Sequence, residues 1–134
     1  RFTPPTHCIR AFQQALVEFD EEGGVQGRGG RYRGNRDLLV RGMRQLGFET
    51  LLPDNLQAPI IITFKMPSDP AFHFQTFYDG LSARGYVIYP GKLTVAESFR
   101  MGCIGRLNQE HMQGALDAVT EVMREMGVDS GSSD

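Results

Sequence analysis

The stretch Phe99–Ile104 (FRMGCI) decides the fold of this chain. Its large apolar residues recur at every second position, which is the spacing of a β-strand with one buried face. Phe99, Met101 and Cys103 therefore share the buried face, and Arg100 projects from the opposite one.

A helix is expected directly after this strand. Asn108 is a favourable N-cap, Gly127 is a typical stop, and apolar residues between them recur at helical spacing. This apolar stripe comprises Met112, Ala115, Leu116, Val119, Met123 and Met126.

Three more strands are expected upstream, at 48–52, 60–64 and 86–89. The run 60–64 is β-branched and lacks polar alternation, so it is predicted to be a central strand that is buried on both faces.

Three helices should accompany these strands. The first should be capped by Thr3 and end at Gly23. The second should follow the glycine- and arginine-rich stretch 27–34 and end at Gly47. The third should start with Asp69 as its N-cap and end at Gly85.

The predicted class is α+β: a small, mainly antiparallel sheet of about four strands with helices packed on one face. Residues 1–24 form a separate N-terminal connector helix, whose apolar face needs another surface. The Gly/Ser-rich residues 128–134 are expected to be a disordered tail.

Composition excludes several functions. The 134 residues carry a net charge of −2, so no overall field attracts nucleic acid or an anionic membrane. No apolar run approaches the roughly 20 residues that span a bilayer. The two cysteines, Cys8 and Cys103, are predicted to be reduced core residues of a cytoplasmic protein.

No catalytic signature is present. The three histidines are scattered without zinc-ligand spacing, so no metal site is expected. Lys65 and Lys92, the only lysines, are interpreted as solvated surface residues rather than Schiff-base formers.

Two features could bind anions. Six arginines between Arg28 and Arg44 resemble an RNA-binding arginine/glycine segment. A solvated helix face that is neutralised by residues 20–22 is the favoured interpretation, because apolar periodicity continues through the tract and the net charge is negative. Arg100 lies within a strand and needs a partner, which could be an internal carboxylate such as Glu97 or a bound carboxylate or phosphonate.

Four segments together carry a family resemblance: 1–7 (RFTPPTH), 22–25 (EGGV), 86–92 (YVIYPGK) and 99–105 (FRMGCIG). In this order they resemble the C-terminal part of 2-aminoethylphosphonate–pyruvate aminotransferase, a class V, fold-type I enzyme that uses pyridoxal 5′-phosphate. The resemblance covers residues 1–127, which it identifies as the small domain.

The resemblance implies a homodimer in which a large domain of the same chain carries the Schiff-base lysine, so this segment alone would be inactive and contains no catalytic residue. The full enzyme would transfer the amino group of 2-aminoethylphosphonate to pyruvate, giving phosphonoacetaldehyde and alanine. Arg100 would bind the acidic group of the substrate, and Thr3 would contact the cofactor phosphate of the partner subunit.

This sequence departs from the family pattern at Cys103, where asparagine is expected, and in the glycine content of residues 27–34. Two alternatives stay open. One is another class V enzyme, of the alanine–glyoxylate or serine–pyruvate type. The other is a non-enzymatic module for RNA binding or interaction that uses the Arg28–Arg44 tract.

Overall fold

The computed structural model describes residues 3–91 and 97–134, and its backbone contacts divide the chain into two units, Arg1–Arg31 and Tyr32–Asp134. The elements in chain order are α1 (Thr6–Glu21), α2 (Gly24–Gln45), the 3-10 turn η1 (Asp54–Leu56), β1 (Ile61–Lys65), α3 (Phe74–Ala83), β2 (Tyr89–Pro90), β3 (Ser98–Gly102) and α4 (Gln109–Met126).

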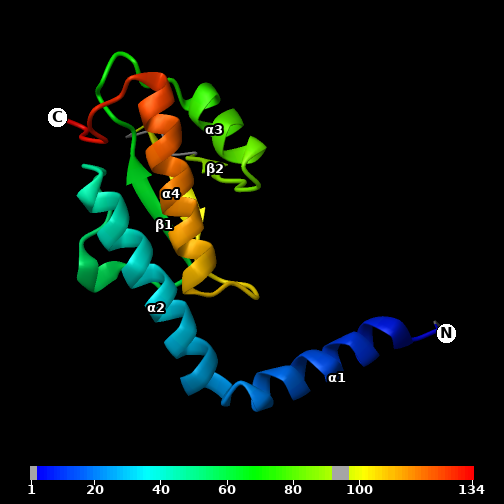
Figure 1. Ribbon diagram of the computed structural model, residues 1–134. Helices are drawn as coiled ribbons and strands as arrows, with labels where there is room; N and C mark the ends of the chain where they lie inside the picture. The colour runs from blue at the N-terminus through cyan, green and yellow to red at the C-terminus, as the bar shows by residue number, and fades with distance from the viewer. Residues whose placement is uncertain (1–2, 92–96) are drawn as a thin grey trace. The chain divides into compact units, whose positions relative to one another are not determined.

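The first unit contains α1 and the beginning of α2 (Figure 1). The predicted N-cap, Thr3, is wrong, because α1 starts at Thr6 with Pro5 in the N-cap position and without a side-chain cap. A proline disfavours helical geometry in the residue before it, so Pro5 keeps Pro4 out of the helix. No residue of α1 is buried within the described chain.

A tight turn separates α1 from α2. Gly23 and Gly24 have φ angles of 88° and 62°, which only glycine adopts readily. The second helix then begins at Gly24 and runs through the glycine-rich stretch, so its predicted start beyond that stretch is wrong. Glu22 contributes to this geometry by accepting hydrogen bonds from Arg28 and Arg31 in the first turns of α2.

The sheet of the second unit has the strand order β1-β3-β2, and both pairings are antiparallel. The central strand is therefore β3, and the prediction of a doubly buried central strand at 60–64 is wrong. In β1 only Ile62 and Phe64 are buried, whereas Ile61 is 39% exposed. A β-branched run without polar alternation does not distinguish a central strand from an edge strand with an apolar outer face.

The predicted fourth strand does not form among the described residues. Segment 48–52 meets β1 through a single bridge between Thr50 and Phe64 and through backbone hydrogen bonds on either side of it. Gly47 and Pro53, which bound this segment, leave little room for a longer ladder. The sheet thus has three strands instead of about four, and the α+β class is confirmed.

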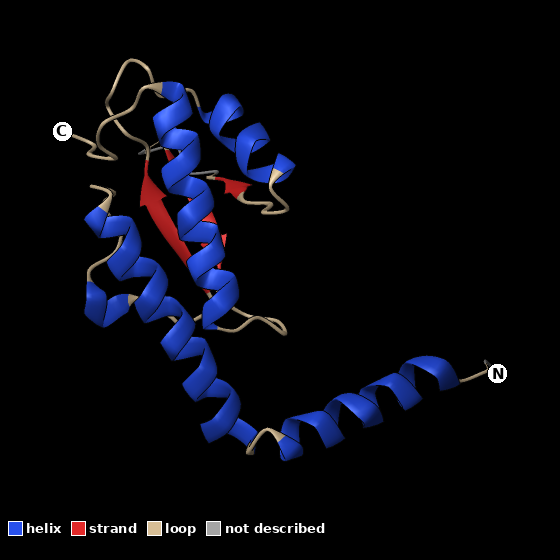
Figure 2. Ribbon diagram, in the orientation of Figure 1, coloured by secondary structure: helices blue, strands red, loops and turns tan. Residues whose placement is uncertain are grey.

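The helices of the second unit cover the sheet on one face, as predicted (Figure 2). Phe99 of β3 is fully buried and forms the centre of an aromatic cluster. Its ring centroid lies 5.6 Å from that of Phe48, 5.6 Å from that of Phe64 and 5.5 Å from that of Phe77. This cluster joins β1, β3 and α3 into one core.

Two helix starts show how local capping operates. Asn108 caps α4 as predicted, and its side chain accepts hydrogen bonds from the amides of Glu110 and His111. Asp69 does not cap α3, which begins at Phe74 with His73 in the N-cap position. The Asp69 carboxylate instead accepts a hydrogen bond from the Ala71 amide at 2.8 Å and stabilises a turn before the helix.

The C-terminal segment 128–134, for which the sequence predicted disorder, packs against other residues of the second unit. Val128 is buried, and the Gly131 amide donates to the Leu46 carbonyl at 2.8 Å. The Ser68 amide donates to the Ser132 carbonyl at 2.8 Å. Glycine fits at position 131 because a Cβ there would lie 2.5 Å from carbon atoms of the Phe48 ring. Within the described ranges, no helix has the length and apolar character needed to cross a bilayer.

Candidate functional site: the outer face of the sheet

The face of the sheet opposite the helices carries a row of three side chains, one from each strand. Arg100 of β3 pairs with Thr63 of β1 on one side and with Tyr89 of β2 on the other. Residues that are directly opposite in an antiparallel pair project to the same face. Because Phe99 and Met101 are buried on the core side, all three members of the row face outward.

Exposed apolar residues lie two to four positions along the chain from the members of this row. Ile61, Ile104 and Val87 are exposed by 39%, 43% and 60% in the second unit. An exposed apolar surface around a charged residue is typical of a face that another protein surface or a ligand covers.

Arg100 has no carboxylate partner within the described part of the chain, and Glu97 does not pair with it. Its Nη2 donates to the Pro90 carbonyl at 3.2 Å. Its Nε is buried and has no hydrogen-bond acceptor among the residues described. A buried guanidinium donor without an acceptor is rare in folded proteins, so this side chain retains donors for an anion.

The position of the Pro90 carbonyl depends on a close backbone approach. The Gly91 amide donates to the Ser98 carbonyl at 2.7 Å. A Cβ at position 91 would lie 2.1 Å from the Ser98 hydroxyl oxygen, so only glycine fits here. Pro90-Gly91 thus fixes the end of β2 against β3, next to the guanidinium.

Thr3, the predicted cofactor-binding residue, lies in the first unit, and Arg100 lies in the second. Thr3 is exposed and precedes the first turn of α1, where no side chain caps the helix. The amides at a helix N-terminus favour a phosphate group, so the local geometry is compatible with such a ligand.

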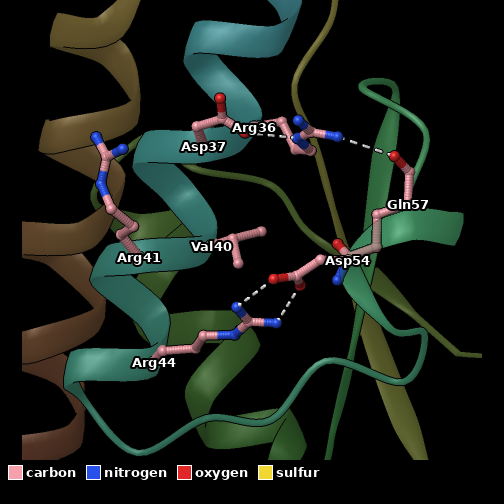
Figure 3. Close-up of a pocket in the computed structure, with 7 residues that line it drawn as sticks. All are labelled: Arg36, Asp37, Val40, Arg41, Arg44, Asp54 and Gln57. Carbon is pink, nitrogen blue, oxygen red and sulfur yellow. Dashed lines mark hydrogen bonds and ion pairs between the residues drawn. The ribbon is translucent and has the colours of Figure 1, made fainter.

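The arginine tract is largely occupied by internal pairs. Arg28 and Arg31 pair with Glu22. Figure 3 shows a surface pocket along α2 in which Arg44 binds both oxygens of Asp54. In the same pocket Arg36 donates to Asp37 at 2.7 Å and to the Gln57 carbonyl at 3.0 Å.

These bonds attach segment 54–57 to α2. The hydrogen bonds from Arg44 hold the pKa of Asp54 below its usual value, so this pair stays charged near neutrality. Arg41 points away from Asp54 in Figure 3. The paired arginines of this pocket thus have a structural role, since they hold segment 54–57 against α2. Because they are paired, they have few donors left for RNA.

The other reactive side chains do not gather into a site. Cys103 is buried as predicted, but Cys8 is exposed on α1, so the prediction of a core position for Cys8 is wrong. Lys65 pairs with Glu49 at 2.8 Å, and Lys92 lies outside the described residues. No group of three His, Cys, Asp or Glu side chains with metal-binding geometry occurs in ranges 3–91 and 97–134.

Sequence reasoning missed Tyr89, Thr63 and Asn35. The first two become neighbours of Arg100 only through strand register, which local sequence does not specify. Asn35 is completely buried on α2, where polar residues are usually exposed. A buried asparagine on a helix gives no periodic signal in the sequence.

By fold, the chain falls into a class of α+β structures that also forms part of two solved aminotransferases. The fold matches that of the ureidoglycine–glyoxylate aminotransferase of Bacillus subtilis with a TM-score of 0.78 at 21% sequence identity. The match covers 92% of this chain and 32% of the Bacillus subtilis chain. A match to a subgroup IV aspartate aminotransferase of Thermus thermophilus covers 69% of this chain and has a TM-score of 0.58 at 20% identity.

Sequence relatives narrow this class. The 2-aminoethylphosphonate–pyruvate transaminase of Rhizobium meliloti is 54% identical over 98% of this chain, and that of Pseudomonas entomophila is 50% identical over 96%. The chain spans about a third of the length of these relatives, 34% and 35% respectively. No family model matches the chain. The chain matches a C-terminal fragment of a class V aminotransferase, and its sequence relatives carry the name 2-aminoethylphosphonate–pyruvate transaminase.

Proposed function

We propose that this chain is the C-terminal domain of a pyridoxal-phosphate-dependent aminotransferase that transfers the amino group of 2-aminoethylphosphonate to pyruvate. Arg100 binds the phosphonate group of the amino donor. The observation that carries the proposal is the placement of Arg100: it faces outward from the central strand without a carboxylate partner among the described residues, and its Nε is buried without an acceptor. The sequence identity of 54% with proteins named 2-aminoethylphosphonate–pyruvate transaminase supports the choice of substrate.

The exposed apolar residues of both units support a larger protein around this chain. In α1, Ile9, Phe12 and Leu16 are exposed by 56%, 64% and 46%, although they recur at helical spacing. The relatives are about three times as long as this chain, so their additional residues are sufficient to cover these surfaces. We propose that a large domain of the same protein, in a homodimer, packs on them.

Pyridoxal phosphate, when bound by such a protein, would supply the electron sink for moving the amino group. On this chain, Thr3 and the first amides of α1 would hold the phosphate of the cofactor that is bound in the partner subunit. Arg100 would hold the substrate at its acidic end and orient the amine toward the cofactor.

The test uses the complete aminotransferase that contains this chain. Replacing a guanidinium that binds a substrate anion should remove roughly 2–4 kcal/mol of transition-state stabilisation, which is about a 30- to 1,000-fold loss in kcat/KM. Arg100→Gln should show this loss, and the matched control Arg124→Gln, on the solvent side of α4, should not. An unchanged kcat/KM in Arg100→Gln would remove Arg100 from the site.

A further inference from the structure

The guanidinium of Arg100 is bonded to β2 and not to β1 among the described residues. Its Nη2 reaches the Pro90 carbonyl on β2 at 3.2 Å, and it makes no hydrogen bond to Thr63 on β1 among the bonds of the described residues. The guanidinium therefore lies beside β2, the strand that carries Tyr89.

Tyr89 is the neighbour of Arg100 on this strand. It is directly opposite Arg100 in the register, so both side chains rise from the same face of adjacent strands. Its side chain is 53% exposed, and within the described structure its hydroxyl makes no hydrogen bond. A tyrosine hydroxyl is a strong donor to an ionised oxygen.

Carboxylates and phosphonates differ in the number of oxygens that need a hydrogen-bond donor at this site. A carboxylate has two oxygens, and the planar fork of one guanidinium satisfies both. A phosphonate has a third oxygen on a tetrahedral phosphorus, and this oxygen needs a donor outside the plane of the fork. A phenol on the neighbouring strand supplies that donor.

We propose that Tyr89 is a specificity-determining residue, whose hydroxyl binds the third oxygen of a phosphonate held by Arg100 and so favours phosphonates over carboxylates. This inference rests on the proposed function, because it takes Arg100 as the anion-binding residue. It adds the group that selects the chemical class of the anion.

The experiment measures competitive inhibition of the complete aminotransferase by ethylphosphonate and by propanoate, which differ only in the acid group. A hydrogen bond to a charged oxygen contributes about 10- to 100-fold in affinity. Tyr89→Phe should raise the inhibition constant of ethylphosphonate by about this factor and change that of propanoate less than threefold. Tyr86→Phe, whose ring packs near Gly114 of α4, is the matched control and should change neither.

Arg100→Gln separates the two proposals. A loss of affinity for both inhibitors in Arg100→Gln, together with unchanged selectivity in Tyr89→Phe, would overturn the role of Tyr89 and leave that of Arg100 intact. Unchanged affinity for both inhibitors in Arg100→Gln would overturn the proposed function itself. A selective loss in Thr63→Val but not in Tyr89→Phe would place the third oxygen on the β1 side and also overturn the inference.

Discussion

Asn35 of α2 holds the segment that follows β3 by donating from Nδ2 to the Cys103 carbonyl at 3.1 Å. The same nitrogen donates to the Leu107 carbonyl at 3.0 Å. One amide group thus joins the helical layer to both ends of the connection between the central strand and α4. This connection begins three residues after Arg100, so Asn35 supports the strand that presents the guanidinium.

Asn35→Ala should destabilise the protein by about 2–6 kcal/mol, because a buried carbonyl that loses its donor costs about 1–3 kcal/mol and two carbonyls are affected. Urea denaturation followed by circular dichroism measures this difference. Asn108→Ala removes an exposed helix cap and should destabilise by only about 1 kcal/mol. Equal losses in the two variants would show that the Asn35 bonds contribute no more than an ordinary cap.

The sequence predicted this fold where burial alternates regularly. Phe99, Met101 and Cys103 are buried as the period of two requires. The predicted apolar stripe of α4 is buried from Met112 to Met123, and its last member, Met126, is half-buried. The resemblance in sequence also indicates Arg100 as a candidate anion-binding residue, and this residue faces outward from the sheet.

What could not be predicted depends on long-range pairing. The neighbours of Arg100 are fixed by register with strands on either side of it, and the central position of β3 follows from pairing order. Likewise, the glycine-rich start of α2 is helical although local propensity argues against it, and Glu22 pairs with two of its arginines.

The two thiols should differ in reactivity. Burial raises the pKa of Cys103 to about 11, and the thiolate is the reactive species. Cys8 is exposed. A disulfide reagent at pH 8 should therefore modify one thiol per native chain rapidly and the second only after denaturation. In Cys8→Ser, rapid modification should disappear. Rapid modification of that variant would show that Cys103 is accessible.

Gly131 tests whether the C-terminal segment is packed. A Cβ at this position would lie 2.5 Å from two carbon atoms of the Phe48 ring, which is itself buried in the aromatic cluster. Gly131→Ala should destabilise by about 1–3 kcal/mol, the usual range for overpacking. Gly30→Ala is the control, because a Cβ there meets no atom within 4 Å, and alanine should stabilise α2 by about 0.5–1 kcal/mol. Thermal unfolding of both variants gives the comparison, and an unchanged Gly131→Ala would favour a disordered tail.

Glu22 should give the first unit a pH dependence in the acidic range. Hydrogen bonds from Arg31 and then Arg28 lower the pKa of its carboxyl to about 2 from an ordinary value of 4.5. Because the pKa is lower in the folded chain, the stabilisation is fully present above pH 4.5 and is lost as the pH falls toward 2. Amide exchange in the first turns of α2 should accelerate over this interval.

Carboxyl-carbon NMR titration measures the pKa of Glu22 directly. Arg31→Gln should raise it toward 4.5 more than Arg28→Gln does, because the bond from Arg31 makes the larger contribution. Arg10→Gln should leave it unchanged, since Arg10 bonds to Gln13 on α1 instead. A wild-type pKa near 4.5 would mean that the two arginines do not hold Glu22 in solution, and that the turn between α1 and α2 depends on its glycines alone.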